Sequence, residues 1–136
     1  MDRLIQIIEN TLRFVVERVH RERPRQVEQL GGNIRKLESN IAKPFHRLTW
    51  DEACDLLHLG KEVGRREKLD FNLREERAIM KHFDDHPVFV IRHPAELKFF
   101  NSKRATKDAR CLSADLLLAP LGETVGAAIR EERAIN

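Results

Sequence analysis

The chain has 136 residues, of which 41% are hydrophobic and 35% are charged, and its formal net charge is +3. This length is enough for one core, so we expect a single domain over residues 1–136. No apolar run reaches the roughly 18 residues of a membrane span, and Met1 leads into an amphipathic segment without a signal-peptide pattern. These features predict a cytoplasmic protein with no membrane partner. Its dispersed lysines and arginines favour a solvated surface over a dedicated nucleic-acid patch.

The first half of the chain has the periodicity of helices, because apolar residues recur every three or four positions. Pro24 ends or kinks the first helix, and Asn33 is a candidate N-cap for a later one. Thr49 and Glu52 have the spacing of a capping box. The charged stretch 61–70 is expected to be a loop or a short turn. Helices are predicted over residues 2–23, 26–30, 33–42, 51–59 and 72–83.

From His86 the pattern changes to that of strands. The continuous apolar run at 87–91 is typical of a buried strand. A turn at 120–122 joins two later strands, which we therefore expect to be antiparallel. Residues 1–83 are mainly helical and residues 86–133 mainly antiparallel strands, so the fold class is α+β. Extended segments are predicted at 45–50, 87–91, 95–100, 111–119 and 123–133.

Cysteine and histidine spacings do not define a metal centre. Cys54 and Cys111 lie in apolar contexts and are expected to be buried, reduced thiols, with a bridge between them as the alternative. His82 and His86 have the i, i+4 spacing of metal-binding helices. Pro87 follows directly, however, and predicts that the helix ends before both rings share a face.

Two acids and an arginine near the end of the chain are the candidate functional residues. Asp115 begins an apolar strand, where a carboxylate without a partner would be costly. The turn brings Glu123 back towards it, so both carboxylates are predicted to approach one ion. Arg130 lies seven residues after Glu123, an odd offset that needs a bulge to share its face, and Gly126 is a candidate for it. Exposed charges or an internal salt bridge are the alternatives.

Two stretches then point to a known family. Residues 86–100 contain a buried-strand run followed by Pro94-x-x-x-Lys98. Residues 115–133 read Asp-Leu-Leu-Leu-Ala-Pro-Leu-Gly-Glu and end in Arg-Glu-Glu-Arg. Together they resemble the class II asparaginyl-tRNA synthetases, a group that includes the aspartyl enzymes and the archaeal asparagine synthetase-related paralogue. Segments 43–49 and 72–76 also fit, so the resemblance covers nearly the whole chain.

The resemblance implies a role for each candidate residue. The acids that match Asp115 and Glu123 hold Mg²⁺ and the phosphates of ATP in this family, and the arginine that matches Arg130 binds the amino-acid substrate. The family's reaction is attack of an amino-acid carboxylate on the α-phosphorus of ATP, followed by transfer to tRNA. Magnesium prefers hard oxygen ligands, and a planar guanidinium suits a carboxylate or amide oxygen.

The departures from the family are equally informative. The chain resembles the part of the catalytic domain between motif 2 and motif 3, and motifs 1, 2 and 3 are not in it. Residues 127–129 are Ala-Ala-Ile where the family has Gly-Ser-Gln. We therefore expect a truncated paralogue that keeps part of the ATP and amino-acid pocket and does not aminoacylate alone.

Two other hypotheses stay open at this point. One is a non-catalytic interaction or regulatory module that forms a homo-oligomer or docks on a synthetase or a tRNA. The other is one half of a split ligase. The sequence does not decide between asparagine and aspartate as the amino acid.

Overall fold

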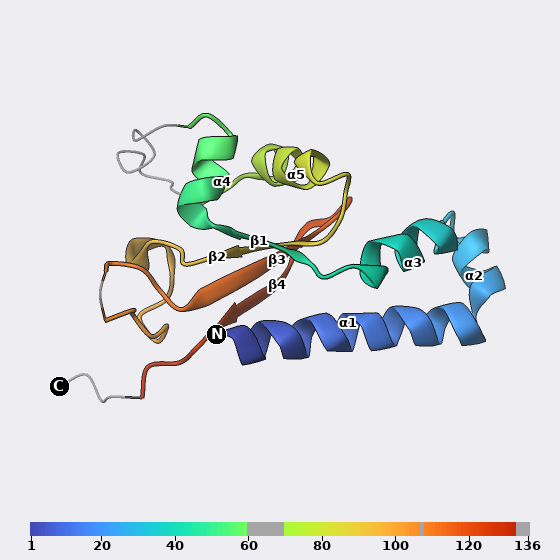
Figure 1. The fold of residues 1–136 in the computed structure, drawn as a ribbon, viewed down its shortest axis with the longest axis horizontal. Helices are drawn as coiled ribbons and strands as arrows, with labels where there is room; N and C mark the ends of the chain where they lie inside the picture. Colours follow the sequence, from blue (N-terminus) through green and yellow to red (C-terminus); the bar gives the residue numbers. More distant parts are fainter. Residues whose placement is uncertain (60–69, 107, 133–136) are drawn as a thin grey trace. The chain divides into compact units, whose positions relative to one another are not determined.

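The computed structural model describes residues 1–59, 70–106 and 108–132, and the chain separates into two compact units (Figure 1). One unit comprises residues 2–45, and the other comprises residues 46–136 together with Met1. The single domain over 1–136 stays a prediction. The loop predicted at 61–70 falls outside the described residues except for Asp70.

The first unit consists of three helices: α1 (Asp2–Glu22), α2 (Pro24–Gln29) and α3 (Ile34–Ala42). They confirm the three helices predicted in this part of the chain. Pro24 stands in the first turn of α2, where a missing N–H costs no hydrogen bond. Asn33 caps α3, since its side-chain oxygen accepts the Lys36 N–H at 3.0 Å.

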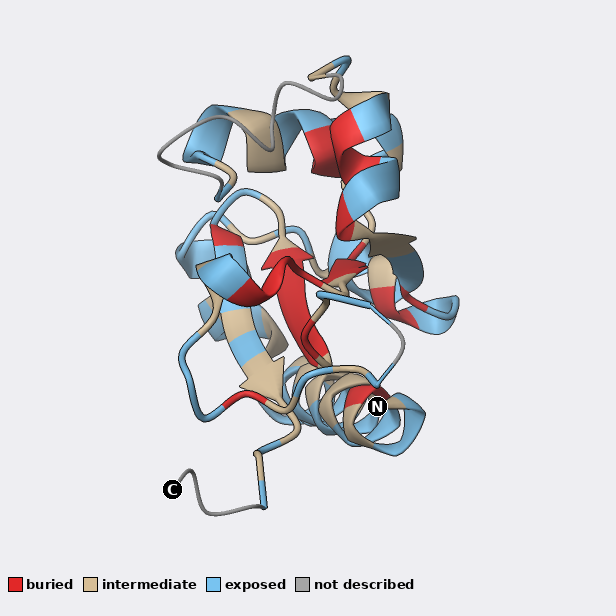
Figure 2. Ribbon diagram, turned by 90° about the vertical axis from the view of Figure 1, so that its left-hand side faces the viewer, coloured by how far each residue is buried: buried red, intermediate tan, exposed pale blue. Residues whose placement is uncertain are grey.

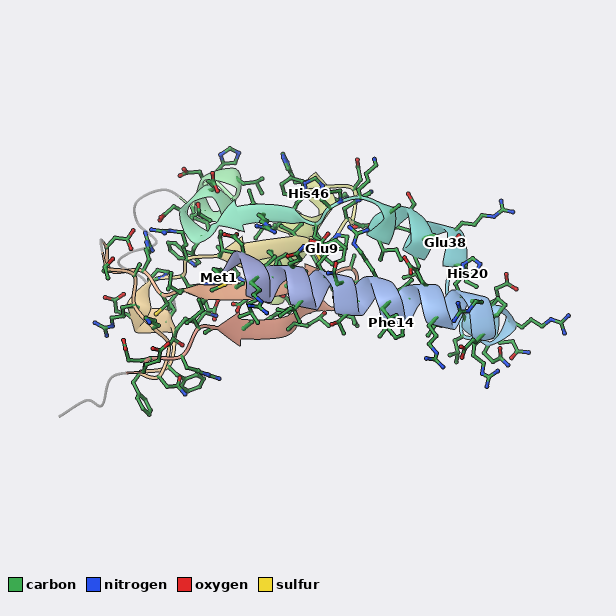
Figure 3. All side chains as sticks on the ribbon, turned by 60° about the horizontal axis from the view of Figure 1, so that its bottom comes forward. Met1, Glu9, Phe14, His20, Glu38 and His46 are labelled. Atoms are coloured by element: carbon green, nitrogen blue, oxygen red, sulfur yellow. The ribbon has the colours of Figure 1, made fainter. Side chains whose placement is uncertain are left out.

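Polar contacts join α1 to α3 and to the residue that follows α3. The Arg13 guanidinium, near the middle of α1, donates to the Glu9 carboxylate at 2.7 Å and to the backbone carbonyls of Ile41 and Lys43. Near the C-terminal end of α1, His20 Nδ1 lies 2.7 Å from Glu38 Oε1 (Figure 3). These contacts fix the helical hairpin that α1 and α3 form.

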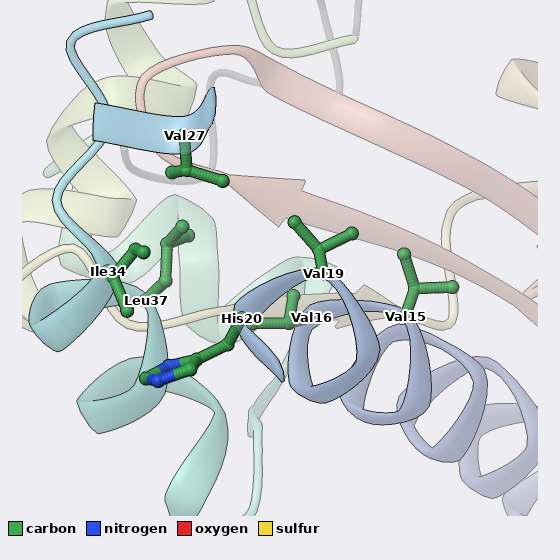
Figure 4. A pocket seen from close by; sticks show the side chains of 7 residues that line it. All are labelled: Val15, Val16, Val19, His20, Val27, Ile34 and Leu37. Carbon is green, nitrogen blue, oxygen red and sulfur yellow. The ribbon is translucent and has the colours of Figure 1, made fainter. Parts of the chain in front are cut away.

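Mainly apolar side chains from all three helices line a small open hollow of about 100 Å³ (Figure 4). Val16 and Val19 of α1 face Val27 of α2 and Leu37 of α3 across it. This packing explains only part of the amphipathic pattern of α1, because Ile7 and Phe14 of the same helix are exposed.

The second unit is built on a four-stranded sheet in the order β1-β2-β3-β4. The strands are β1 (His46–Thr49), β2 (Val88–Ile91), β3 (Ser113–Leu118) and β4 (Gly122–Ala128). β1 pairs with β2 in parallel, and the other two pairings are antiparallel. The α+β class is confirmed, but the sheet is mixed and not purely antiparallel. The reason is the long connection between β1 and β2, which includes two helices among its described residues and returns the chain in its original direction.

Helices α4 (Trp50–Leu56) and α5 (Leu73–His82) lie on the same face of this sheet (Figure 1). The predicted capping box of Thr49 and Glu52 opens α4, and a second one, at Asn72 and Glu75, opens α5. Both helices are shorter than predicted. α5 ends at His82, so the i, i+4 spacing to His86 does not lie on one helix.

The core of this unit lies between α4, α5 and the sheet. Buried residues concentrate in the two central strands, β2 and β3 (Figure 2). Cys54 and Cys111 are both free and buried, which confirms the prediction of reduced thiols. Among the described residues, no helix has the length and apolar character to cross a membrane. The main core cluster consists of Trp50, Ala53, Cys54, Ile79, Met80, Val88, Val90 and Leu117.

Candidate functional site

A bulge in the β3–β4 hairpin places the two predicted acids on one face of the sheet. Asp115 pairs with Gly126 and Leu117 pairs with Glu123, so one residue of β4, Thr124, has no partner in the register. Because residues directly opposite in a pair share a face, this extra residue restores Glu123 to the face of Asp115. Gly126, the position considered for a bulge, is paired with Asp115, and the extra residue is Thr124.

The two carboxylates converge on the bare backbone of Gly126. A Cβ atom added there would lie 2.8 Å from Glu123 Oε1 and 3.8 Å from Asp115 Oδ1. The two oxygens are thus separated by no more than the sum of those distances. Because Gly126 has no side chain, a small space stays open between the Glu123 and Asp115 carboxylate oxygens.

Asp115 is almost completely buried, at 5% exposure, and its other oxygen is held by two donors. Lys98 Nζ lies 2.5 Å from Asp115 Oδ2, and His93 Nε2 lies 3.1 Å from the same atom. Burial raises the pKa of Asp115, but the hydrogen bonds and charges of His93 and Lys98 outweigh it and leave the pKa below its usual value. Asp115 is an ionised, paired carboxylate at neutral pH.

Glu123 has a different environment, since no cation is paired with it among the contacts of the described residues. Its backbone N–H donates to Glu76 Oε2 of α5 at 3.1 Å, which brings a further carboxylate close to it. Burial, followed by the negative charge of Asp115, raises the pKa of Glu123. Burial also raises the pKa of Glu76. The positive charge of Lys98 acts in the opposite direction on Glu123 but does not outweigh the burial and the negative charge, and this end of the hairpin favours a bound cation.

Arg130 lies beyond the end of β4. The strand predicted over 123–133 is too long, because β4 ends at Ala128 and the next residues bond to loops. Arg130 forms an isolated antiparallel bridge with Ser102, and its Nη1 donates to Asn101 Oδ1 at 2.9 Å. The loop after Lys98 therefore holds the arginine, which sequence spacing alone assigns to a strand.

All three predicted site residues line one open groove of about 470 Å³. Lys98 and Asp70 add a positive and a negative charge to its wall. The lining thus carries three carboxylates and two cationic side chains. Two converging carboxylates fit Mg²⁺, which proteins commonly bind through one or two carboxylates while substrate phosphates and water complete the shell. No larger cluster of metal-ligating side chains occurs within the described residues.

Sequence reasoning did not assign a site role to Lys98 or His93. Lys98 belongs to the Pro94-x-x-x-Lys98 pattern, and the turn η2 (Ala95–Leu97) carries it back to β3. His93 could not be placed by alternation along β2. Arg92 has a left-handed φ of 61°, which breaks the two-residue period and turns His93 to the face of Asp115.

Comparisons with known proteins show the family of the chain. A family model described as tRNA synthetases class II (D, K and N) matches residues 1–136. The chain belongs to this family. It is 36% identical over 124 residues to an asparagine–tRNA ligase of Desulforamulus reducens, covering 90% of this chain and 28% of that protein. It is also 36% identical over 140 residues to the Streptococcus sanguinis ligase, covering 96% of this chain and 31% of the relative.

Solved structures give the same answer for the fold. The chain matches asparaginyl-tRNA synthetase from Pyrococcus horikoshii with a TM-score of 0.80 and 30% identity, over 94% of this chain and 30% of that one. The same synthetase complexed with asparaginyl-adenylate matches with a TM-score of 0.81 at 29% identity. The fold is thus part of a class II synthetase catalytic domain, and the chain spans about a third of the length of these relatives.

Proposed function

We propose that this class II synthetase-related chain binds ATP with Mg²⁺, and asparagine or aspartate, in the groove of Asp115, Glu123 and Arg130. One observation carries the proposal: two carboxylates from different positions of a bulged hairpin converge on Gly126, in a groove that Arg130 also lines. One similar structure, the Pyrococcus horikoshii synthetase complexed with asparaginyl-adenylate, supports the same ligand chemistry.

Each side chain has a distinct task in this proposal. Asp115 and Glu123 would hold Mg²⁺, which neutralises phosphate charge when bound. Arg130 offers a planar guanidinium to the carboxylate or amide at the end of the amino acid. Lys98 offers a second positive charge on the groove wall for an anionic group of a ligand.

We further propose that this chain by itself does not catalyse aminoacylation. The groove's two cationic side chains are partly engaged, since Lys98 is paired with Asp115 and Arg130 donates to Asn101. Stabilising the charge on transferring phosphate usually needs several cations aimed at its oxygens, and each lost group commonly costs a few kcal/mol of barrier. A chain with this groove alone would bind substrates but accelerate their reaction little.

Calorimetric titration tests binding and separates the ligands. The chain is titrated with Mg²⁺–ATP, then with asparagine and with aspartate in the presence of a non-hydrolysable ATP analogue. The Arg130→Ala variant is expected to keep nucleotide binding and lose amino-acid binding. The Asp115→Asn variant is expected to lose the part of the nucleotide affinity that depends on Mg²⁺. Absence of heat for wild type at millimolar ligand would remove the binding proposal.

A non-catalytic interaction module is the second candidate, and one observation favours it. Ile7 and Phe14 stand seven residues apart on α1 and are 55% and 59% exposed, which is unusual for two large apolar side chains on one helical face. Light scattering on wild type and on Phe14→Ser tests this: a strict monomer for both variants argues against self-association through α1.

A further inference from the structure

His93 is a buried titratable residue that the proposed function does not use. Its exposure is 1%, and that of its neighbour Ser113 is also 1%. Both ring nitrogens have partners, since Nε2 lies 3.1 Å from Asp115 Oδ2 and Nδ1 lies 3.0 Å from Ser113 Oγ. A ring with two defined partners is fixed in orientation.

The Asp115 carboxylate determines which nitrogen of His93 carries the proton. An ionised carboxylate only accepts hydrogen bonds, so Nε2, the ring nitrogen 3.1 Å from it, carries a proton and donates it. In a neutral ring Nδ1 is then an acceptor, and the Ser113 hydroxyl, which also accepts the His93 backbone N–H at 3.3 Å, donates its own hydrogen to Nδ1.

The two donors to Asp115 differ in their access to the groove. Lys98 lines the groove and can be drawn to an anion bound there. His93 is not among the lining residues and is buried behind the carboxylate. When a ligand occupies Lys98, His93 therefore remains as the donor that keeps Asp115 Oδ2 in place.

We propose that His93 is a positioning residue: it holds Asp115 Oδ2 from behind, so that Oδ1 is presented beside Glu123 to a divalent cation. This inference rests on the proposed function, because it concerns the same site. Its physical basis is that a buried donor, out of reach of the groove, fixes the rotamer of a metal-binding carboxylate before the metal binds. Loss of such partners typically reduces metal affinity tenfold to a hundredfold.

Two amides of different length separate positioning from general stability. Glutamine at position 93 carries an N–H donor at about the reach of Nε2, whereas asparagine ends at about the reach of Nδ1. We therefore expect His93→Gln to keep the donor to Asp115. His93→Asn keeps the contact with Ser113 and loses the one with Asp115. Both variants remove one ring, so their effects on packing are matched.

In the experiment, each variant is titrated with Mn²⁺ in the presence of ATP, and the concentration of free Mn²⁺ is measured by electron paramagnetic resonance. The melting temperature of each variant is measured as well. His93→Asn is expected to weaken Mn²⁺ binding at least tenfold, and His93→Gln less than threefold. His86→Leu, a histidine replacement outside the groove, is the control that should leave binding unchanged.

The outcomes separate the two proposals. If wild type does not bind Mn²⁺, the proposed function fails and the inference fails with it. If wild type binds Mn²⁺, and His93→Asn and His93→Gln bind Mn²⁺ with the same affinity as each other, only the positioning role of His93 is overturned. If His93→Asn does not fold, Ser113→Ala replaces it. That variant removes the hydroxyl that holds Nδ1 and so the orientation of the ring, and unchanged Mn²⁺ affinity in folded Ser113→Ala therefore also overturns the role.

Discussion

Replacement of Gly126 by alanine is expected to separate ligand binding from stability. The added methyl group would lie 2.8 Å from Glu123 Oε1, closer than Cβ atoms approach other atoms in proteins. That oxygen is the end of a flexible side chain, so it turns away at little cost. Gly126 does not have a left-handed φ, and its backbone therefore accepts alanine without strain.

The magnitudes follow from this geometry. Gly126→Ala removes conformational freedom of the unfolded chain, worth about 0.4–1 kcal/mol in favour of folding, so the melting temperature should stay level or rise. The displaced Glu123 carboxylate no longer faces Asp115 across the open space. Misplacing one part of a metal site costs about tenfold to a hundredfold in affinity, which corresponds to about 1.4–2.7 kcal/mol.

A double-mutant cycle is the assay for this mechanism. Mn²⁺ affinity in the presence of ATP is measured for wild type, Gly126→Ala, Glu123→Gln and the double variant. If the methyl acts by moving Glu123, the double variant binds no more weakly than Glu123→Gln alone. Fully additive losses, or wild-type affinity in Gly126→Ala, would refute the reasoning.

Four further predictions concern stability and reactivity. Glu123→Gln should stabilise the protein at neutral pH by no more than about 1 kcal/mol, because the raised pKa of Glu123 makes its ionised form unfavourable in the folded state and solvent screens the effect. This gain should vanish in thermal melts as the pH falls through the folded pKa of Glu123 towards the ordinary value of 4.5. Asp115→Ala should cost about 3 kcal/mol in urea unfolding, since it leaves Lys98 and His93 without their acceptor. Gly122→Ala should cost about 1–3 kcal/mol, because Gly122 has a φ of 90° and a Cβ there would meet Glu76 Oε2 at 2.2 Å; equal stability would contradict that assignment. Burial raises the pKa of Cys54 to about 12 and also raises that of Cys111, so both thiols should react with a disulfide reagent at pH 8 only after denaturant is added.

The helices could be predicted from local signals. Apolar spacing and Pro24 were sufficient for α1 and α2, and the caps at Asn33 and Thr49 placed the starts of α3 and α4. These signals depend only on neighbours in the chain. The parallel pairing of β1 with β2 depends on a crossover of more than thirty residues, and no residue of either strand encodes its direction.

The site was predictable in its residues and less so in its geometry. Asp115, Glu123 and Arg130 line one groove, as expected, and their individual roles stay predictions. The bulge at Thr124 could not be located from the sequence, because any residue of β4 can be the extra one. The contact of His93 with Asp115 depends on the left-handed φ of Arg92, a conformation that its side chain gives no reason to expect.

One measurement tests most directly whether this groove binds Mg²⁺–ATP. Uniformly ¹⁵N-labelled protein is titrated with Mg²⁺–ATP, and the amide resonances are followed by nuclear magnetic resonance. The largest shifts are expected at Gly126 and Ala127, with little change at Val27 in the helical unit. Shifts confined to the helical unit, or none at millimolar ligand, would contradict binding in this groove.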